Sequence, residues 1–89
     1  MTDKDPRDLL EFPCDYQFKA IGAAGERFRR DVCTVVSRHA DAANEAVNWQ
    51  ESRHGNYQSV SLRVTLQSYE QMTLIYAELK TLDGLKMLL

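Results

Sequence analysis

The feature that most constrains this chain is a strict two-residue alternation between positions 59 and 66. Apolar and polar residues take turns there: Val60, Leu62, Val64 and Leu66 against Ser59, Ser61, Arg63 and Thr65. Successive side chains of a β-strand point to opposite faces. Such a strand buries one face and leaves the other in water, so the rest of the chain must supply neighbouring strands and a layer to cover the apolar side.

Three other segments predict strands. Residues 14–22 alternate in the same way, and residues 85–89 predict a short closing strand. Residues 47–53 predict a strand joined to the one at 59–66 by a hairpin turn at 54–56. Gly55 suits that turn because glycine adopts a positive φ at little cost.

Two segments have helical periodicity instead. Between Glu26 and His39 the apolar residues fall at i, i+4, i+7 and i+8, which is one face of a helix: Phe28, Val32, Val35 and Val36. Ser68, followed three positions later by Gln71, is a capping-box signature and predicts a second helix that runs to about Leu82. The polar, alanine-rich stretch at 41–45 is expected to form a loop.

The resulting order, strand–helix–strand–strand–helix–strand, predicts an α+β fold, the ferredoxin-like sandwich. Right-handed crossovers place both helices on one face of a four-stranded antiparallel sheet with strand order 4-1-3-2. We expect residues 9–89 to form this single domain and the charged residues 1–8 to be a flexible tail. The face under the helices is expected to receive Phe18, Val60, Leu62, Val64, Leu66 and Met87.

Composition indicates which partners and which cellular compartment to expect for this domain. The net charge of −2 gives no general attraction for nucleic acid or for anionic lipid. Cys14 and Cys33 are the two cysteines, too few for the disulfide framework of a small secreted domain. No apolar stretch approaches the length that crosses a bilayer, and the first residues do not form a signal peptide. We therefore expect a cytoplasmic protein.

Several chemistries that this fold can host lack the residues they need. Two cysteines without a Cys-x-x-Cys pair do not make an iron–sulfur or soft-metal site, so no metal or cofactor is expected. RNA recognition needs aromatic platforms on the central strands, where only Tyr57 is available on the open side. His39 is expected to act as a cation at a helix end and His54 as a solvated turn residue, so no enzyme activity is predicted.

The uncovered sheet face is the best candidate for a binding surface. With strand order 4-1-3-2 it carries Lys86, Lys19 and Arg63 on three neighbouring strands, a set that suits a carboxylate, a phosphate or an acidic partner. The alternative is a solvated face kept cationic against aggregation. The turn at 22–25 is a further candidate, because its backbone N–H groups could face an anion. The alternative is a plain tight turn, which the negative charge of Glu26 beside it favours.

The hairpin tip is the third candidate, through His54, Asn56 and Tyr57. Its alternative explanation is turn chemistry alone, since Gly-Asn is what a tight hairpin favours.

Five segments together carry a family resemblance: Leu9-Leu10-Glu11-Phe12-Pro13, Phe18-Lys19-Ala20-Ile21-Gly22, Arg38-His39-Ala40, Gly55-Asn56-Tyr57-Gln58-Ser59-Val60-Ser61, and Glu70-Gln71 with Ile75-Tyr76-Ala77-Glu78-Leu79. In this order they resemble the YbeD-like family of bacterial proteins, described as lipoate regulatory proteins of unknown function. The resemblance implies a fold similar to the ACT-type regulatory domain. Its lipoate label comes from gene neighbourhood, and it carries no established catalytic or ligand residues.

These observations lead to two hypotheses. The first is a regulatory or adaptor module that binds a protein partner, with a lipoate-attachment enzyme as the partner class that the resemblance implies. The second is an ACT-like sensor that binds a small carboxylate or amino acid at a dimer interface. In either case we expect a monomer or a weak homodimer that binds neither nucleic acid nor membrane.

Overall fold

The computed structural model describes residues 11–40 and 42–89. Its elements in chain order are β1 (Cys14–Ala23), α2 (Glu26–His39), β2 (Ala42–Glu51), β3 (Tyr57–Leu66), α3 (Tyr69–Leu79) and β4 (Leu85–Leu88). The predicted order of strands and helices is therefore confirmed. The tail predicted at 1–8 lies outside the described residues. Neither helix in the described part is long and apolar enough to cross a bilayer.

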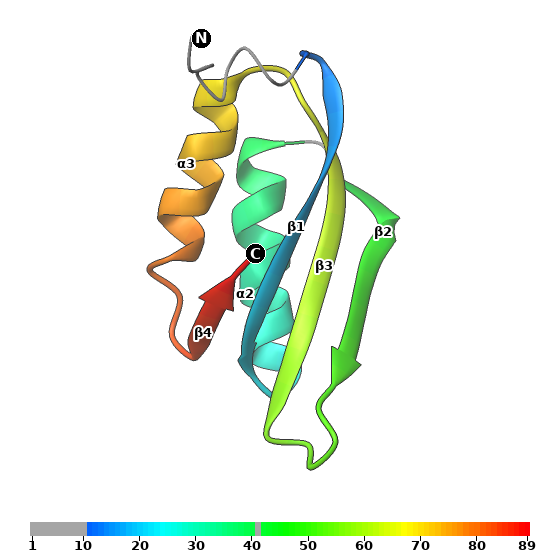
Figure 1. The fold of residues 1–89 in the computed structure, drawn as a ribbon, viewed down its shortest axis with the longest axis vertical. Coiled ribbons are helices and arrows are strands. Elements are labelled where there is room, and N and C mark those ends of the chain that lie inside the picture. Colours follow the sequence, from blue (N-terminus) through cyan, green and yellow to red (C-terminus); the bar gives the residue numbers. More distant parts are fainter. Residues whose placement is uncertain (1–10, 41) are drawn as a thin grey trace, which may run out of the picture.

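The four strands form one antiparallel sheet in the order β2-β3-β1-β4, with both helices on the same side of it (Figure 1). This is the strand order 4-1-3-2 that the sequence predicts. β1 and β3 lie in the centre and pair along their whole length, from Cys14 opposite Leu66 to Ala23 opposite Tyr57. Within the described residues, neither helix covers the opposite side of the sheet, so half of the side chains on these two strands face away from the core.

The core lies between the central strands and the two helices. The alternating apolar residues of β3 and the single helical face of α2 meet there, which is why both patterns are visible in the sequence. The buried apolar residues of the sheet are Phe18, Ala20, Val60, Leu62, Val64 and Leu66. Those of the helices are Phe28, Val32, Val35, Val36, Met72, Ile75 and Leu79.

The turn from β1 into α2 depends on two glycines. A Cβ atom on Gly22 would lie 2.3 Å from Cζ of Phe28, so the absence of a side chain lets that ring pack directly on the backbone. Gly25 precedes the helix with φ 114°, a conformation that other residues rarely adopt. Glycines at these positions therefore allow the helix to pack closely at the end of β1.

The capping box predicted at the start of α3 is present in a modified form. The backbone N–H of Gln71 donates to Oγ of Ser68 at 3.1 Å, as predicted. The return bond differs, because Oε1 of Gln71 accepts from the backbone N–H of Gln67 at 2.6 Å. The amide nitrogen of Gln71 then donates to the carbonyl of His39 at 2.5 Å and joins the start of α3 to the end of α2.

The predicted bounds of β2 and α3 differ from those in the structure. The loop expected at 41–45 was wrong beyond Asp41, which is outside the described residues, because β2 already begins at Ala42. β2 is irregular there, since it advances five residues (42 to 47) while β3 advances two (64 to 62). This irregularity removes the alternation that identifies a strand. The strand expected to reach Arg53 ends at Glu51, and α3 ends at Leu79 instead of near Leu82.

The expected core position of Met87 was also wrong. Met87 lies opposite Ile21, whereas the next β1 residue, Gly22, lies opposite Leu85, so Lys86 is an extra residue in β4. Such a bulge breaks the alternation, and it leaves both Lys86 and Met87 exposed. The side chain of Met87 is 53% exposed, and Leu85 and Leu88 pack against the core in its place.

Candidate functional site

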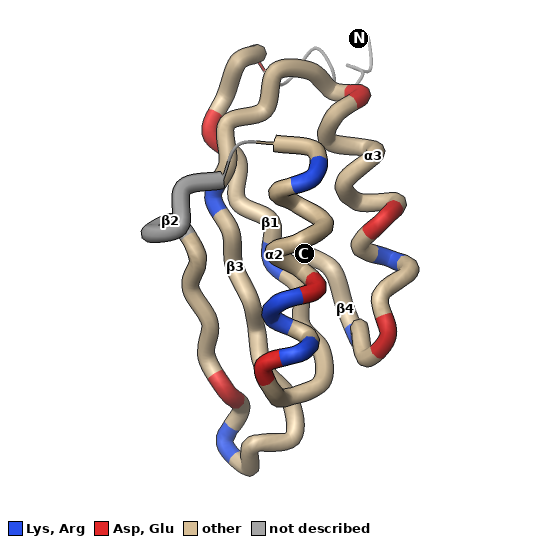
Figure 2. Tube along the Cα trace, turned by 180° about the vertical axis from the view of Figure 1, so that it is seen from behind, with Lys and Arg blue, Asp and Glu red and all other residues tan. Residues whose placement is uncertain are grey.

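The uncovered face of the sheet carries the three cations expected there. Lys19 lies opposite Ser61, and Arg63 lies opposite Gln17, so the two basic residues are diagonal neighbours on β1 and β3. Diagonal neighbours in an antiparallel pair are about 7–8 Å apart, close enough for both side chains to contact one bound group. Figure 2 shows basic positions on β3, β1 and β4.

Lys86 lies on the same face, near the end of the sheet where the β2–β3 hairpin turn is. Its Nζ atom is 5.8 Å from the centre of the Tyr57 ring, a cation–π distance. The hairpin also meets the turn after β1, because the N–H of Ala24 donates to the carbonyl of Asn56 at 3.2 Å. The cationic face, the hairpin tip and the glycine turn, which are separate in the sequence, therefore adjoin one another. His54 and Asn56 are exposed in the hairpin turn.

Basic side chains outnumber acidic ones on this face. Among the described residues, Asp15 is the acidic residue there, and its carboxylate accepts a hydrogen bond from Oγ1 of Thr65 at 3.1 Å. Apolar groups lie beside the cations on this face: Ile21 is half-buried, and Tyr57 and Met87 are 45% and 53% exposed. Positive charge beside exposed apolar surface suits an acidic, partly apolar protein surface.

A shallow polar concavity of about 300 Å³ lies at the β2 side of this face. Its lining consists of Lys19, Asn48, Trp49, Gln50, Ser59 and Ser61. Ammonium, amide and hydroxyl groups of this kind donate hydrogen bonds to carboxylates. The concavity can therefore hold a carboxylate group, from a small molecule or from a partner's side chain.

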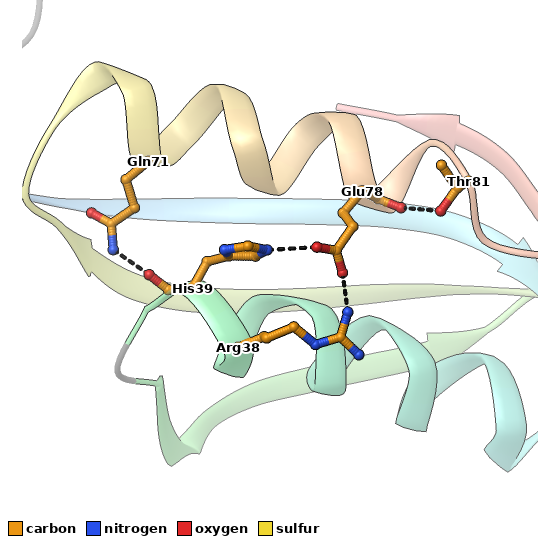
Figure 3. Close-up of polar contacts among 5 residues, drawn as sticks. All are labelled: Arg38, His39, Gln71, Glu78 and Thr81. Carbon is orange, nitrogen blue, oxygen red and sulfur yellow. Dashed lines mark hydrogen bonds and ion pairs between the residues drawn. The ribbon is translucent and has the colours of Figure 1, made fainter.

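The expected role of His39 was incomplete. It ends α2, as predicted, but its Nε2 atom lies 2.6 Å from Oε1 of Glu78 on α3, and Arg38 binds the other carboxylate oxygen of Glu78 (Figure 3). The hydrogen bond with His39, together with the charge of Arg38, holds the pKa of the Glu78 carboxyl below its ordinary value. This cluster joins the two helices, so we assign it to stability and not to the uncovered face.

A second polar contact, between β1 and α3, involves two tyrosines. The hydroxyl groups of Tyr16 and Tyr76 are 2.7 Å apart. Burial raises the pKa of the Tyr76 phenol, and the hydrogen bond with Tyr16 raises it further. Tyr76 therefore stays protonated near neutral pH. Both rings pack edge-on against Phe18.

Sequence patterns missed a third group of residues, at the edge of the helix layer. The guanidinium carbon of Arg29 lies 3.8 Å from the centre of the Trp49 ring, and Arg29 donates a hydrogen bond to Oε1 of Gln58. Gln58 was the one residue in the sequence that could have indicated this group, because it is polar but lies at a core-facing position of β3. Its burial, at 1% exposed, shows that it serves an internal contact.

Comparison with known sequences identifies close relatives. The family model described as "Protein of unknown function (DUF493)" matches residues 7–89. A UPF0250 protein of Shewanella sediminis is 37% identical over 89 residues, which cover all of both chains. A UPF0250 protein of Vibrio vulnificus is 39% identical over 89 residues, covering 99% of this chain and 95% of the relative.

Comparison with solved structures identifies the fold. The ACT domain from GTP pyrophosphokinase of Chlorobium tepidum matches with a TM-score of 0.67 at 11% identity, covering 84% of this chain and 94% of that domain. The protein HP0495 from H. pylori matches with a TM-score of 0.69 at 12% identity, covering 99% of this chain and 98% of that protein. The ferredoxin-like, ACT-type fold is therefore established. Sequence identities this low give no information about the function of this chain.

Proposed function

Because this chain belongs to the YbeD-like family of proteins of unknown function (DUF493), we propose that it is a regulatory or adaptor module that acts by binding a protein partner. The binding surface is the uncovered sheet face. One observation carries the proposal: Lys19, Arg63 and Lys86 share that face with the exposed apolar side chains of Tyr57 and Met87.

The mixture of groups on this face favours a protein partner over a small ligand. Tyrosine and arginine are among the side chains that most often supply binding energy in protein interfaces. The cations would attract an acidic surface and fix its orientation, while Tyr57 and Met87 would bury apolar area. In this proposal the module works in the cytoplasm, needs no cofactor and carries out no chemistry itself.

The partner class comes from the family and not from the geometry. The lipoate label of the YbeD-like proteins rests on gene neighbourhood, which makes an enzyme of lipoate attachment the first partner to test. Direct regulation of such an enzyme would require only that the uncovered face bind it and shift its conformational equilibrium.

Charge reversal tests this proposal. Lys19→Glu combined with Arg63→Glu should abolish capture of the partner from native lysate, while the circular dichroism spectrum stays unchanged because both side chains lie outside the core. A matched control, Arg27→Glu combined with Lys80→Glu, alters the net charge equally on the helix layer and should leave capture intact. Equal capture by the wild type and the Lys19/Arg63 variant would remove the uncovered face from consideration.

A small-molecule sensor is the second candidate, and the polar concavity beside Lys19 is the observation that favours it. A ligand that binds only the folded state raises the unfolding temperature according to its concentration relative to Kd. Thermal unfolding with octanoate, lipoate and the amino acids should shift upward for a sensor. An unchanged midpoint across this panel, with capture of a protein partner, would support the adaptor.

A further inference from the structure

The outer edge of β2 carries backbone groups that are directed away from the sheet. β2 is the terminal strand, and its register with β3 is regular from Val47 to Glu51. The N–H of Ser52 donates to the carbonyl of Tyr57, which fixes the phase of the ladder. Hydrogen-bonded pairs alternate along an antiparallel ladder, so the N–H and C=O groups of Trp49 point outward. Trp49 is therefore positioned to pair with an added strand.

The side chain of Trp49 lies on the helix side of the sheet, since its partner across the ladder is the buried Val60. Trp49 is 46% exposed, and the Arg29 guanidinium lies over its ring, 3.8 Å from the ring centre. Arg29 is held in turn by Oε1 of Gln58 at 3.1 Å. The amide nitrogen of Gln58 donates to the carbonyls of Ala23 and Gly25 at 2.7 Å each. The Trp–Arg pair is thus fixed before any partner arrives.

Arg29 differs from the other arginines of α2 in its partners. Arg27 pairs with Asp31 at 3.9 Å, Arg30 pairs with Glu26 at 3.1 Å, and Arg38 pairs with Glu78. Among the described residues, Arg29 contacts an amide and an aromatic ring but no carboxylate. A guanidinium has five N–H donors, and one hydrogen bond to Gln58 leaves most of them available.

From these contacts we infer that the outer edge of β2 binds an extended peptide segment of a partner, with a carboxylate side chain opposite Trp49. Residues directly opposite in an antiparallel pair project to the same face, so this side chain would lie beside the Trp49 ring and reach Arg29. Main-chain hydrogen bonds to Trp49 would supply affinity, and the Arg29–carboxylate contact would supply specificity.

The same geometry predicts the register of the bound segment. Glu51 also faces the helix side, two residues after Trp49, and its carboxylate lies against the hairpin turn at Gly55. An acidic residue opposite Glu51 would be repelled, whereas one opposite Trp49 meets Arg29. The site is separate from the uncovered face, because Lys19 and Arg63 point to the other side of the sheet.

Trp49 is the only tryptophan in the chain, so its fluorescence reports on this edge alone. The probe is the peptide acetyl-Thr-Val-Thr-Glu-Thr-Val-Thr-amide, compared with the same peptide carrying Gln in place of Glu. We expect a saturable change in emission with the Glu peptide, and affinity about tenfold weaker for the Gln peptide, the usual gain from a hydrogen bond to a charged group. No saturable change up to millimolar peptide would overturn the inference.

Two variants keep the test specific. Arg29→Gln should remove the preference for the Glu peptide, while Arg30→Gln, which breaks only the pair with Glu26, should retain it. A preference that survives Arg29→Gln contradicts the inference. Emission that depends on protein concentration and does not respond to peptide would show a second copy at this edge, and it would contradict the inference too.

Discussion

The Nζ atom of Lys86 lies 5.8 Å from the centre of the Tyr57 ring, a contact between the extra residue of β4 and the first residue of β3. It joins the hairpin end of the sheet to the cations on its uncovered face. The binding surface proposed above is therefore continuous from Arg63 to Tyr57, with charged groups along it and aromatic and thioether groups at one end.

Tyr57 is expected to contribute more to partner binding than to stability. Tyr57 is 45% exposed, so Tyr57→Ala should change the unfolding free energy by less than about 0.5 kcal/mol. Loss of an interface aromatic commonly costs more than 1 kcal/mol, and we expect partner affinity to fall about tenfold or more. Titration calorimetry with the captured partner measures this.

The control is Leu74→Ala, which removes a 56% exposed apolar side chain on the helix layer and should not change that affinity. Equal losses in the two variants would show that the interface does not lie on the uncovered face.

Gln58 is expected to be a strong determinant of stability. It donates to two carbonyls of the β1–α2 turn and accepts from Arg29, all from a buried side chain. Gln58→Leu leaves those carbonyls without their donor and should lower the unfolding free energy by about 2–3 kcal/mol. Urea unfolding measures the loss. The exposed Gln50→Leu serves as control and should change stability by less than about 0.5 kcal/mol. A similar small change at Gln58 would contradict its assigned role.

The contact between Gly22 and Phe28 predicts a coupled pair of substitutions. Gly22→Ala places a methyl group where the Phe28 ring lies and should cost about 1–3 kcal/mol through overpacking. In a Phe28→Leu background the same substitution should cost less, because the ring atoms it meets are gone. A double-mutant cycle by chemical unfolding checks this. Additive costs would contradict the assigned contact between residue 22 and the Phe28 ring.

The Glu78 cluster predicts a loss of stability in acid. The folded-state pKa of Glu78 is lowered, so its ionised form stabilises the fold at pH values above the ordinary carboxyl pKa of 4.5. That stabilisation is lost as the pH falls through the lowered value. The difference in unfolding free energy between the wild type and Glu78→Gln should therefore shrink as the pH falls below about 4.5. A difference independent of pH down to 3 would contradict the assigned contacts.

Much of the fold follows from local pattern. The alternation of β3 and the spacing of Phe28, Val32 and Val36 report directly which side faces the core, so the bounds of α2 and the strand order agree with prediction. The family resemblance is confirmed by relatives that match along the whole chain. Lys19 and Arg63 lie where the alternation places them, on the uncovered face.

The remaining features depend on irregularities that the periodic spacing of apolar residues does not reveal. One extra residue in β4 places Met87 on the surface and not in the core. The irregular register after Ala42 removes the alternation there, so the sequence predicts a loop where the structure has a strand. The contacts of Arg29 with Trp49 and of His39 with Glu78 join residues 20 and 39 positions apart (49 − 29 and 78 − 39). Only tertiary packing brings them together.

The central claim is that partners bind the uncovered face of the sheet. The most direct test is a titration of ¹⁵N-labelled protein with the partner that the wild type captures and the Lys19→Glu, Arg63→Glu variant does not. The largest changes in amide chemical shift should occur at Lys19, Ile21, Ser61, Arg63 and Lys86. The amide chemical shifts of α2 and α3 should not change. Shifts confined to the two helices, with those of β1 and β3 unmoved, would contradict the account.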